Sequence, residues 1–497
     1  MLKSLIVKIP LLTLLLVACS RHPSLPTDFQ RIDEFAQIFP DYVGVTVPPN
    51  IAPLNFLAID ADDVVAEFKY NNLKLNYGGK DNKVQIDEKE WHELLAQAKG
   101  KSLAVTVYAK KQGKWLAYKP FPIHVAEEDV DPYVSFRQLP PTFVGYGELS
   151  IRQRNLTNFE EKTIYNNRQV SHGLEGQCIN CHSYQNYGTD NMMFHMRMQN
   201  PGTMIVYQGQ LIFVNLKDET MISAAAYNSW HPHLPIIAFS TDHTMQSFHT
   251  RDITKVEVME SASDLIIYDV EHNRVTTVLN DSTELELFPS WSPDGKWLYY
   301  CSAHYEYRGK YEDTTDLLED FRKLQYNLYR LSFDERTMTF GEPELIYDAA
   351  SKNRSAVQPR ASKDGRYLLF AEGPCGLFHI WHTSADVQIL DLQTSQLVDA
   401  AALNSPLPES YPSFSSSDRW ILLESRRDDG NYTRTYIAYF DKQGKVHKPF
   451  LVPMEDPEYF RLLLRSWSRP EFMKEPVRIT PRQFAEKALT TPIQVSK

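Results

Sequence analysis

Along most of the chain, apolar residues occur in short runs that are separated by turn-forming residues. Within residues 51–128, runs of this kind are residues 64–68, 102–108 and 115–118, and glycine, asparagine, aspartate and proline lie between them. Short apolar runs bounded by such residues predict β-strands, and a single helix is expected at 88–98. We therefore predict an all-β protein in which residues 51–128 form a small immunoglobulin-like β-sandwich with a structural or docking role.

The second half of the chain repeats one pattern. Residues 289–296 read Pro-Ser-Trp-Ser-Pro-Asp-Gly-Lys and precede an apolar run, and related segments begin at Asn228, Pro359 and Pro412. An Asp-Gly pair forms the tight turn that joins two antiparallel strands, and four such strands make a β-propeller blade. We predict a β-propeller of about six blades, or alternatively seven, in residues 129–470. Residues 460–467 are expected to close the ring, and residues 471–497 to form a C-terminal tail.

One short motif indicates chemistry. Cys178, Cys181 and His182 form the pattern Cys-x-x-Cys-His within the segment 170–200. In this pattern the two thiols bond covalently to c-type haem and the histidine is the proximal ligand of the iron. The alternatives are a thioredoxin-like redox pair, a zinc site and a strained disulfide. The first lacks a βαβ context and the second lacks another Cys or His pair at short spacing, so we predict one covalent haem c.

The repeat also predicts where the motif lies in the propeller. If the next blade begins at the motif, Cys181-His182-Ser183 takes the position that Ser290-Trp291-Ser292 holds in a later blade. The innermost strand of each blade lines the central channel of a propeller. We therefore expect the haem near the mouth of that channel.

Residues 192–198 hold the candidates for the second ligand of the iron. They are Met192, Met193, His195 and Met196; a methionine would raise the reduction potential and a histidine would lower it. If the segment is a strand, Met193, His195 and Arg197 share one face and the even-numbered residues share the other. The alternative is that the methionines fill the core. Arg197 is expected to pair with a haem propionate or with an internal carboxylate.

The start of the chain predicts export. Residues 1–18 hold two lysines and an apolar run too short to span a membrane, which is typical of a signal peptide. The residues before Cys19 resemble a bacterial lipobox, so Cys19 is expected to carry lipid and residues 19–50 to form a tether with one short helix; an ordinary signal peptide is the alternative. Ser20 favours delivery to the outer membrane, on its periplasmic side. No acidic run argues for display on the cell surface, although that location stays open.

Charge and the remaining cysteines narrow the possibilities further. After removal of residues 1–18 the net charge is −13, from 50 Lys and Arg against 63 Asp and Glu. Such an acidic chain is a poor partner for nucleic acid. Cys301 and Cys375 are expected to be buried free thiols, with a disulfide between them as the alternative.

The core of the repeat, Ser-x-Ser-Pro-Asp-Gly-Lys, resembles the TolB-type propeller repeat. The whole chain resembles a group of bacterial lipoproteins in which a TolB-like propeller is interrupted by one Cys-x-x-Cys-His. The segments that carry this resemblance are residues 50–56, 153–159, 178–183 and 192–197. The resemblance covers nearly all of the mature chain, and it implies a fold rather than an activity.

Three functions are compatible with these features. The first is a monohaem electron carrier, anchored to the outer membrane by lipid, that passes electrons between redox protein partners. The second is a monohaem peroxidase-like enzyme, and the third is a propeller interaction scaffold with a structural or sensory haem. A peptidase is disfavoured because no Gly-x-Ser-x-Gly pattern is present. We favour the electron carrier, and leave open whether the protein is an enzyme.

Overall fold

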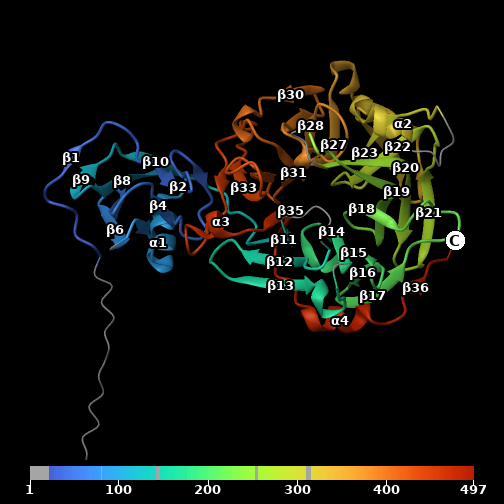
Figure 1. Ribbon diagram of the computed structural model, residues 1–497, viewed down its shortest axis with the longest axis horizontal. Helices are drawn as coiled ribbons and strands as arrows, with labels where there is room; N and C mark the ends of the chain where they lie inside the picture. Colours follow the sequence, from blue (N-terminus) through green and yellow to red (C-terminus); the bar gives the residue numbers. More distant parts are fainter. Residues whose placement is uncertain are drawn as a thin grey trace, which may run out of the picture.

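The computed structural model describes residues 22–79, 81–140, 146–173, 175–251, 256–308 and 315–496. A small N-terminal domain sits beside a larger ring of sheets (Figure 1). The predicted signal peptide and the predicted lipidation site Cys19 lie outside the described residues. No helix in the described ranges has the length and apolarity that a bilayer crossing needs.

The N-terminal domain consists of two sheets and one helix. Its strands are β1 (Gln30–Arg31), β2 (Ile38–Phe39), β3 (Thr46–Val47), β4 (Phe56–Ala58), β5 (Asp63–Tyr70), β6 (Leu73–Gly79), β7 (Lys83–Val84), β8 (Ser102–Lys111), β9 (Lys114–Ala117) and β10 (Phe121–Val125). Strands β2, β4 and β7 form the smaller sheet, and the other seven form the larger one. Helix α1 (Glu88–Ala98) has the predicted bounds, and its Trp91 packs edge-on against Phe68, with 5.9 Å between ring centroids.

The predicted tether is wrong for part of its length. Strands β1 and β3 pair in parallel with β9 and β10, and β2 pairs antiparallel with β4. Residues 30–47 therefore belong to the folded domain, and the domain begins before residue 51. The sequence failed to show this because each strand has only two residues and the segment is rich in proline. The immunoglobulin-like topology of this domain stays a prediction.

The larger part of the molecule is a β-propeller with six blades in the described residues. The blades, each written with its innermost strand first, are β35 (Ser466–Met473), β11 (Tyr133–Leu139), β12 (Ser150–Asn155) and β13 (Glu161–Asn166); β14 (Gln177–Gln185), β15 (Gly188–Met198), β16 (Gly202–Tyr207) and β17 (Gln210–Asn215); β18 (Ala225–Trp230), β19 (Ile236–Phe248), β20 (Val256–Asp269) and β21 (Arg274–Leu279); β22 (Glu284–Trp291), β23 (Trp297–His304) and β24 (Asn327–Asp334) with β25 (Thr339–Phe340) and β26 (Glu344–Tyr347); β27 (Ser355–Ala361), β28 (Tyr367–Gly373), β29 (Asp386–Asp391) and β30 (Gln396–Val398); and β31 (Glu409–Phe414), β32 (Trp420–Ser425), β33 (Arg434–Tyr439) and β34 (Phe450–Leu451). The predicted fold class, all-β with a propeller, is confirmed.

The ring closes by pairing its last inner strand with its first outer strands. Strand β35 pairs antiparallel with β11, from Tyr133 opposite Met473 to Leu139 opposite Ser466. The rings of Phe136 and Trp467 stack across this seam with centroids 3.6 Å apart. The closing strand was expected at residues 460–467, where the structure instead has the short helix α3 (Tyr459–Leu462). The principle of closure was therefore right and its position was wrong.

Each innermost strand contains a β-bulge at the same place. The register shifts once in each of these strands, and one residue there adopts a positive φ between 46° and 60°: Cys181, Tyr227, Phe288, Gln358, Tyr411 or Arg469. A bulge lets two residues of one strand oppose one residue of its neighbour. All of these residues except Cys181 line a narrow central cavity, so the six bulges constrict the channel near its middle.

The bulges correct the predicted register of the motif. Cys181 is equivalent to Phe288, so Ser183 rather than Cys181 takes the position of Ser290. The prediction was therefore wrong by two residues, although it placed the motif correctly on an innermost strand. His182 falls at the position that proline holds in four other blades and Asn228 holds in one.

The C-terminal segment is folded rather than a free tail. Strand β35 reaches Met473, helix α4 (Pro481–Ala488) follows, and β36 (Ile493–Gln494) adds a parallel strand to β17. A capping box at Thr480 and Gln483 starts α4, and Phe484 packs against Phe194 with centroids 5.3 Å apart. The segment forms a strap under the first two blades (Figure 1). Four further short elements are α2 (Thr315–Asp320), η2 (Phe321–Lys323), η4 (His379–Trp381) and η5 (Ala401–Leu403), with η1 (Asn167–Gln169) and η3 (Ala350–Lys352) in connecting loops.

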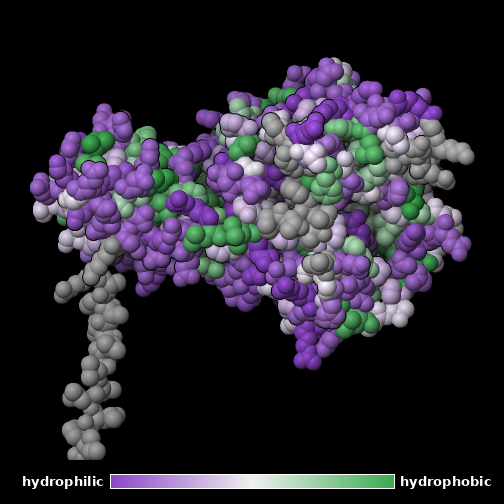
Figure 2. All heavy atoms as spheres, in the orientation of Figure 1, coloured by the Kyte–Doolittle hydropathy of each residue, from purple (hydrophilic) through white to green (hydrophobic). Residues whose placement is uncertain are grey.

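The N-terminal domain and the propeller share one hydrophobic core. A single cluster of buried residues runs from Phe56 and Phe68 of the domain to Trp420 and Trp467 of the propeller. The surface is largely hydrophilic on the face shown in Figure 2, and its apolar side chains form small separate patches. The two parts are therefore packed together through buried apolar side chains as well as surface charges.

Candidate functional site

A hollow opens at one end of the channel, on the N-terminal side of the bulges. Its walls include Cys178 and Cys181 of β14, Arg197 of β15, Tyr227 of β18 and Trp381 of η4. It contains about 730 Å³ of atom-free space, part of which is open to solvent. Cofactor pockets usually have volumes of 300–1,000 Å³ and combine apolar walls with a few placed polar groups. The hollow therefore has the size and the composition of a ligand site.

Two thiols of the predicted site face this hollow. Cys178 and Cys181 are 4% and 2% exposed, and neither forms a disulfide. Cys178 lies opposite Arg197 in the antiparallel pair of β14 and β15, so both side chains emerge on the same face of the sheet. Arg197 donates from Nη2 to Cys178 Sγ over 3.7 Å and is itself exposed within the hollow. The bulge turns Cys181 toward the same space.

His182 is buried next to these thiols. Its ring is 0% exposed, and neither ring nitrogen has a hydrogen-bond partner among the described residues. Burial lowers the pKa of His182 to about 3, and the nearby charges of Arg469 and Arg137 lower it further. The imidazole is therefore neutral at physiological pH. A neutral imidazole with a free nitrogen is the form that binds a metal ion.

These three residues fit a covalently attached haem. Buried polar atoms are normally hydrogen-bonded, so two unpartnered nitrogens on one buried ring need an explanation. Two free thiols that face one hollow, with this ring beside them, are the donor set that c-type haem uses. His182 does not line the hollow itself, whereas both cysteines do. When bound, the group would supply one-electron redox chemistry.

The predicted second ligands divide between the two faces of β15, as alternation requires. Met192 and Met196 are fully buried in a cluster with Ile179 and Phe194, on the side away from the hollow. Met193 packs in a different core cluster, and Met198 is 51% exposed. For Met192, Met193 and Met196, this packing favours the alternative interpretation, that they fill the core.

His195 lies on the face of the hollow. It stands opposite Asn180, which lines the hollow, in the pairing of β14 and β15. Its Nδ1 lies 3.0 Å from Thr203 Oγ1, and its Nε2 has no partner among the described residues. Burial lowers the pKa of His195 to about 3, and Arg197 lowers it further. Of the four candidates, His195 is the one whose free nitrogen and position suit a second ligand.

Sequence reasoning missed the residues that come from other blades. Tyr227 and Trp381 line the hollow but lie 46 and 200 residues beyond Cys181. Tyr227 could have been found, because it holds the same bulge position as Cys181. Trp381 lies on a loop between β28 and β29, where the sequence shows no repeat. Its ring also carries the guanidinium of Arg426, at 4.5 Å from the centroid.

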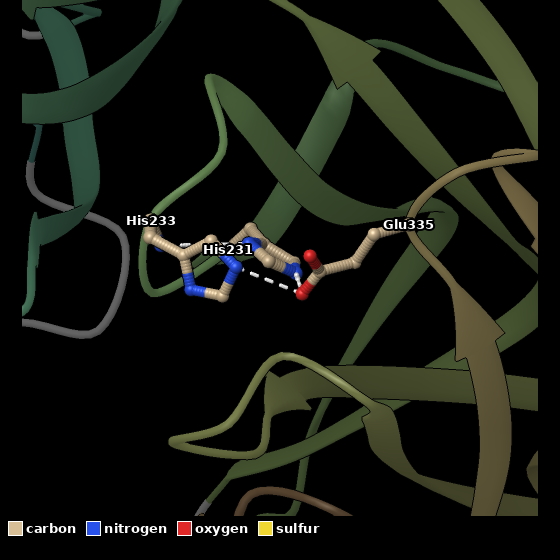
Figure 3. Close-up of side chains that lie close together, drawn as sticks. All are labelled: His231, His233 and Glu335. Carbon is tan, nitrogen blue, oxygen red and sulfur yellow. Dashed lines mark hydrogen bonds and ion pairs between the residues drawn. The ribbon is translucent and has the colours of Figure 1, made fainter.

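A second group of possible metal ligands is built for a different purpose. His231, His233 and Glu335 lie close together (Figure 3). Nδ1 of His231 accepts a hydrogen bond from the N–H of Leu234 at 3.1 Å, so Nε2 carries the proton and donates to the carbonyl of Gly295 at 3.1 Å. Both nitrogens of this ring are therefore in use. His231 holds the turn between β18 and β19, and the remaining two side chains are too few for a metal site.

The other two cysteines are structural. Cys301 and Cys375 are both buried and free, as expected. Burial raises the pKa of Cys375 to about 11 and raises that of Cys301 well above its ordinary value. Neither thiol is therefore reactive at neutral pH.

Comparison with known proteins adds little to this picture. No family model and no curated protein matches the chain. Among solved structures, the chain is similar to puromycin hydrolase at 12% identity and a TM-score of 0.37, over 66% of this chain and 54% of that one. It is also similar to cobalt-substituted Synechocystis ACO, at 13% identity and a TM-score of 0.38, over 89% and 97% of the two chains.

A third similarity is to hydrazine synthase from Kuenenia stuttgartiensis, at 11% identity and a TM-score of 0.32 over 53% and 64% of the two chains. The chain thus spans about half the length of puromycin hydrolase and less than two thirds of that hydrazine synthase chain. Similarities at this level carry no argument about function. The assignment as a propeller rests on the sheet topology of the chain itself.

Proposed function

We propose that this protein is a monohaem c-type cytochrome that transfers electrons between redox protein partners. The observation that carries the proposal is the pair of buried free thiols, Cys178 and Cys181, that faces one hollow beside the unpartnered ring of His182. In this proposal Cys178 and Cys181 form the two thioether bonds and His182 is the proximal ligand. The protein is of the TolB-like lipoprotein type, and Cys19 anchors it in the outer membrane on the periplasmic side.

Electron transfer is favoured over peroxidase-like catalysis by the position of His195. A carrier needs both axial positions of its iron filled, whereas a peroxidase needs one position open for its substrate. His195 lies on the face of the hollow with a free nitrogen. We therefore assign His195 as the second ligand, and Arg197 as a partner for a haem propionate because its cation is exposed in the same space.

A second candidate function is an interaction scaffold. A second hollow, of about 810 Å³, opens at the other end of the channel and is lined by residues from all six blades, among them Tyr187, Trp291 and Lys363. It lies on the C-terminal side of the bulges, away from Cys178. In this alternative the haem is structural or sensory, and the second hollow binds a protein partner.

The test is to export the protein from cells that attach haem and to record its absorption spectrum. A six-coordinate low-spin spectrum that carbon monoxide and peroxide leave unchanged supports a carrier. A spectrum that changes with either ligand supports an enzyme or a sensor. Loss of all covalent haem from the Cys178→Ser, Cys181→Ser double variant, with retention in Cys375→Ser, is expected. A parent protein that carries no haem would overturn the proposal.

A further inference from the structure

Two acidic side chains are buried close to the hollow without enough partners. Asp242 of β19 is 6% exposed and Glu260 of β20 is 0% exposed. One oxygen of each carboxyl group, Asp242 Oδ1 and Glu260 Oε2, has no hydrogen-bond partner among the described residues. A buried charged group without partners is strongly unfavourable. These two side chains have no part in the electron carrier as described so far.

Hydrogen bonds connect Glu260 to the wall of the hollow. Its Oε1 accepts from the hydroxyl of Tyr227 at 3.3 Å and from Thr244 Oγ1 at 3.2 Å. Tyr227 and Thr244 both line the hollow, together with Cys178 and Cys181. The carboxyl pair is therefore one side chain away from the space that the cofactor would fill.

The surroundings keep this pair protonated. Burial raises the pKa of both carboxyl groups, and the charge of Asp242 raises that of Glu260 further. Arg197 from β15 opposes this effect on both, but its guanidinium is exposed. The other titratable groups that act on the pair are Tyr227 of β18, Asp264 of β20, Cys301 of β23 and Tyr326 before β24. Burial raises the pKa of each of these four groups, so none of them is a cation.

We propose that Asp242 and Glu260 form a proton-binding site that takes up one proton when one electron enters the hollow. The inference rests on the proposed function and adds a regulation of the same site. A redox protein partner supplies the electron, solvent supplies the proton, and the carboxyl pair holds that proton until the electron leaves. The added negative charge favours the protonated pair, because like charges disfavour ionisation in a buried site.

The experiment is a redox titration of the haem-loaded protein at a series of pH values. With one proton taken up per electron, the midpoint potential falls by about 59 mV for each tenfold decrease in proton activity. The fall is expected over the window around neutral pH in which the pair titrates. Glu260→Gln and Asp242→Asn are each expected to flatten this slope. An infrared band of a protonated carboxyl that weakens on oxidation in the parent and is absent from Glu260→Gln gives a second readout.

A matched control is Glu286→Gln. Glu286 is also buried, at 3% exposure, and also has an unpartnered oxygen, but none of its contacts lines the hollow. Its variant should keep the slope of the parent. A haem-loaded parent whose potential does not change between pH 5 and 9 would overturn the inference and leave the proposed function standing. A protein without haem would overturn the proposed function and this inference with it. Equal slopes in Glu260→Gln and Glu286→Gln would place the proton elsewhere and contradict the assignment.

Discussion

Strands β14 and β22 are innermost strands of two blades, and they share a backbone but not a chemistry. Each has a bulge with a residue at positive φ, 60° at Cys181 and 53° at Phe288. In β22 the next residue is Pro289, and Phe288 packs against Tyr227 with ring centroids 4.3 Å apart. In β14 the next residue is His182, and the bulge presents a thiol. The propeller thus supplies one geometry six times, and two side chains decide which blade can bind a cofactor.

The largest expected effect separates these two strands directly. Replacing the proximal ligand in His182→Ala should abolish the low-spin spectrum, because no other free imidazole lies on β14 in the described residues. The equivalent substitution in β22, Pro289→Ala, should leave the spectrum as it is in the parent. Absorption spectroscopy of both haem-loaded variants makes the comparison. A low-spin spectrum that survives in His182→Ala would show that another residue is the proximal ligand.

The next effect tests the scaffold that the blades share. Gly295 and Gly365 occupy equivalent Asp-Gly turns with φ of 74° and 72°. A Cβ at Gly295 would lie 2.5 Å from the ring of His231, whose nitrogens are both hydrogen-bonded, whereas a Cβ at Gly365 would meet Pro293 at an ordinary 3.5 Å. Left-handed backbone costs about 1–2 kcal/mol for either alanine, and the clash adds about 1–3 kcal/mol at 295 alone.

Chemical denaturation of Gly295→Ala and Gly365→Ala measures this difference. We expect Gly295→Ala to lower the free energy of unfolding by about 2–5 kcal/mol, and Gly365→Ala by about 1–2 kcal/mol. Equal losses in the two variants would mean that His231 does not constrain its turn.

The smallest effect concerns a buried acid that β22 has and β14 lacks. Glu286 takes the position of Ile179, and burial raises the pKa of Glu286 to about 9, with Asp264 and Glu284 raising it further. The folded state therefore keeps a proton that the unfolded state releases above its ordinary pKa of 4.5. Between these pH values the folded state binds more protons, so the contribution of Glu286 to stability falls as pH rises.

Glu286→Gln removes this titration. Its free energy of unfolding should exceed that of the parent by an amount that grows from pH 5 to pH 8, where it reaches about 1–3 kcal/mol. Denaturation curves of both proteins at several pH values provide the measurement. A difference that is constant with pH would show that Glu286 is already ionised in the fold.

Much of the architecture could be predicted because it repeats. The Asp-Gly turns and the apolar runs after them recur in several blades, so the propeller, its inner strands and the place of the motif among them followed from the sequence. Helix α1 followed too, since Glu88 to Ala98 is long enough to show its own pattern. The short strands β1 to β3 did not, because two residues show no periodicity.

The bulge explains the error in the register of the site. It inserts an extra residue at positions occupied by Cys, Tyr, Phe, Gln, Tyr and Arg, none of which signals a positive φ. Only the three-dimensional pairing shows that Cys181 is equivalent to Phe288. The same alignment brings Tyr227 to the hollow, and with it the carboxyl pair. Residues such as Trp381 lie beyond prediction because they reach the hollow from a loop without a repeat.

The central claim is that the bulge of β14 holds a covalent haem. Mass spectrometry of the proteolytic fragment that contains Cys178 and Cys181, from protein exported by cells that attach haem, tests it most directly. The claim predicts one haem on this fragment, bonded to both cysteines, and none on the fragments with Cys301 or Cys375. A fragment with two unmodified thiols, or with a disulfide between them, would contradict it.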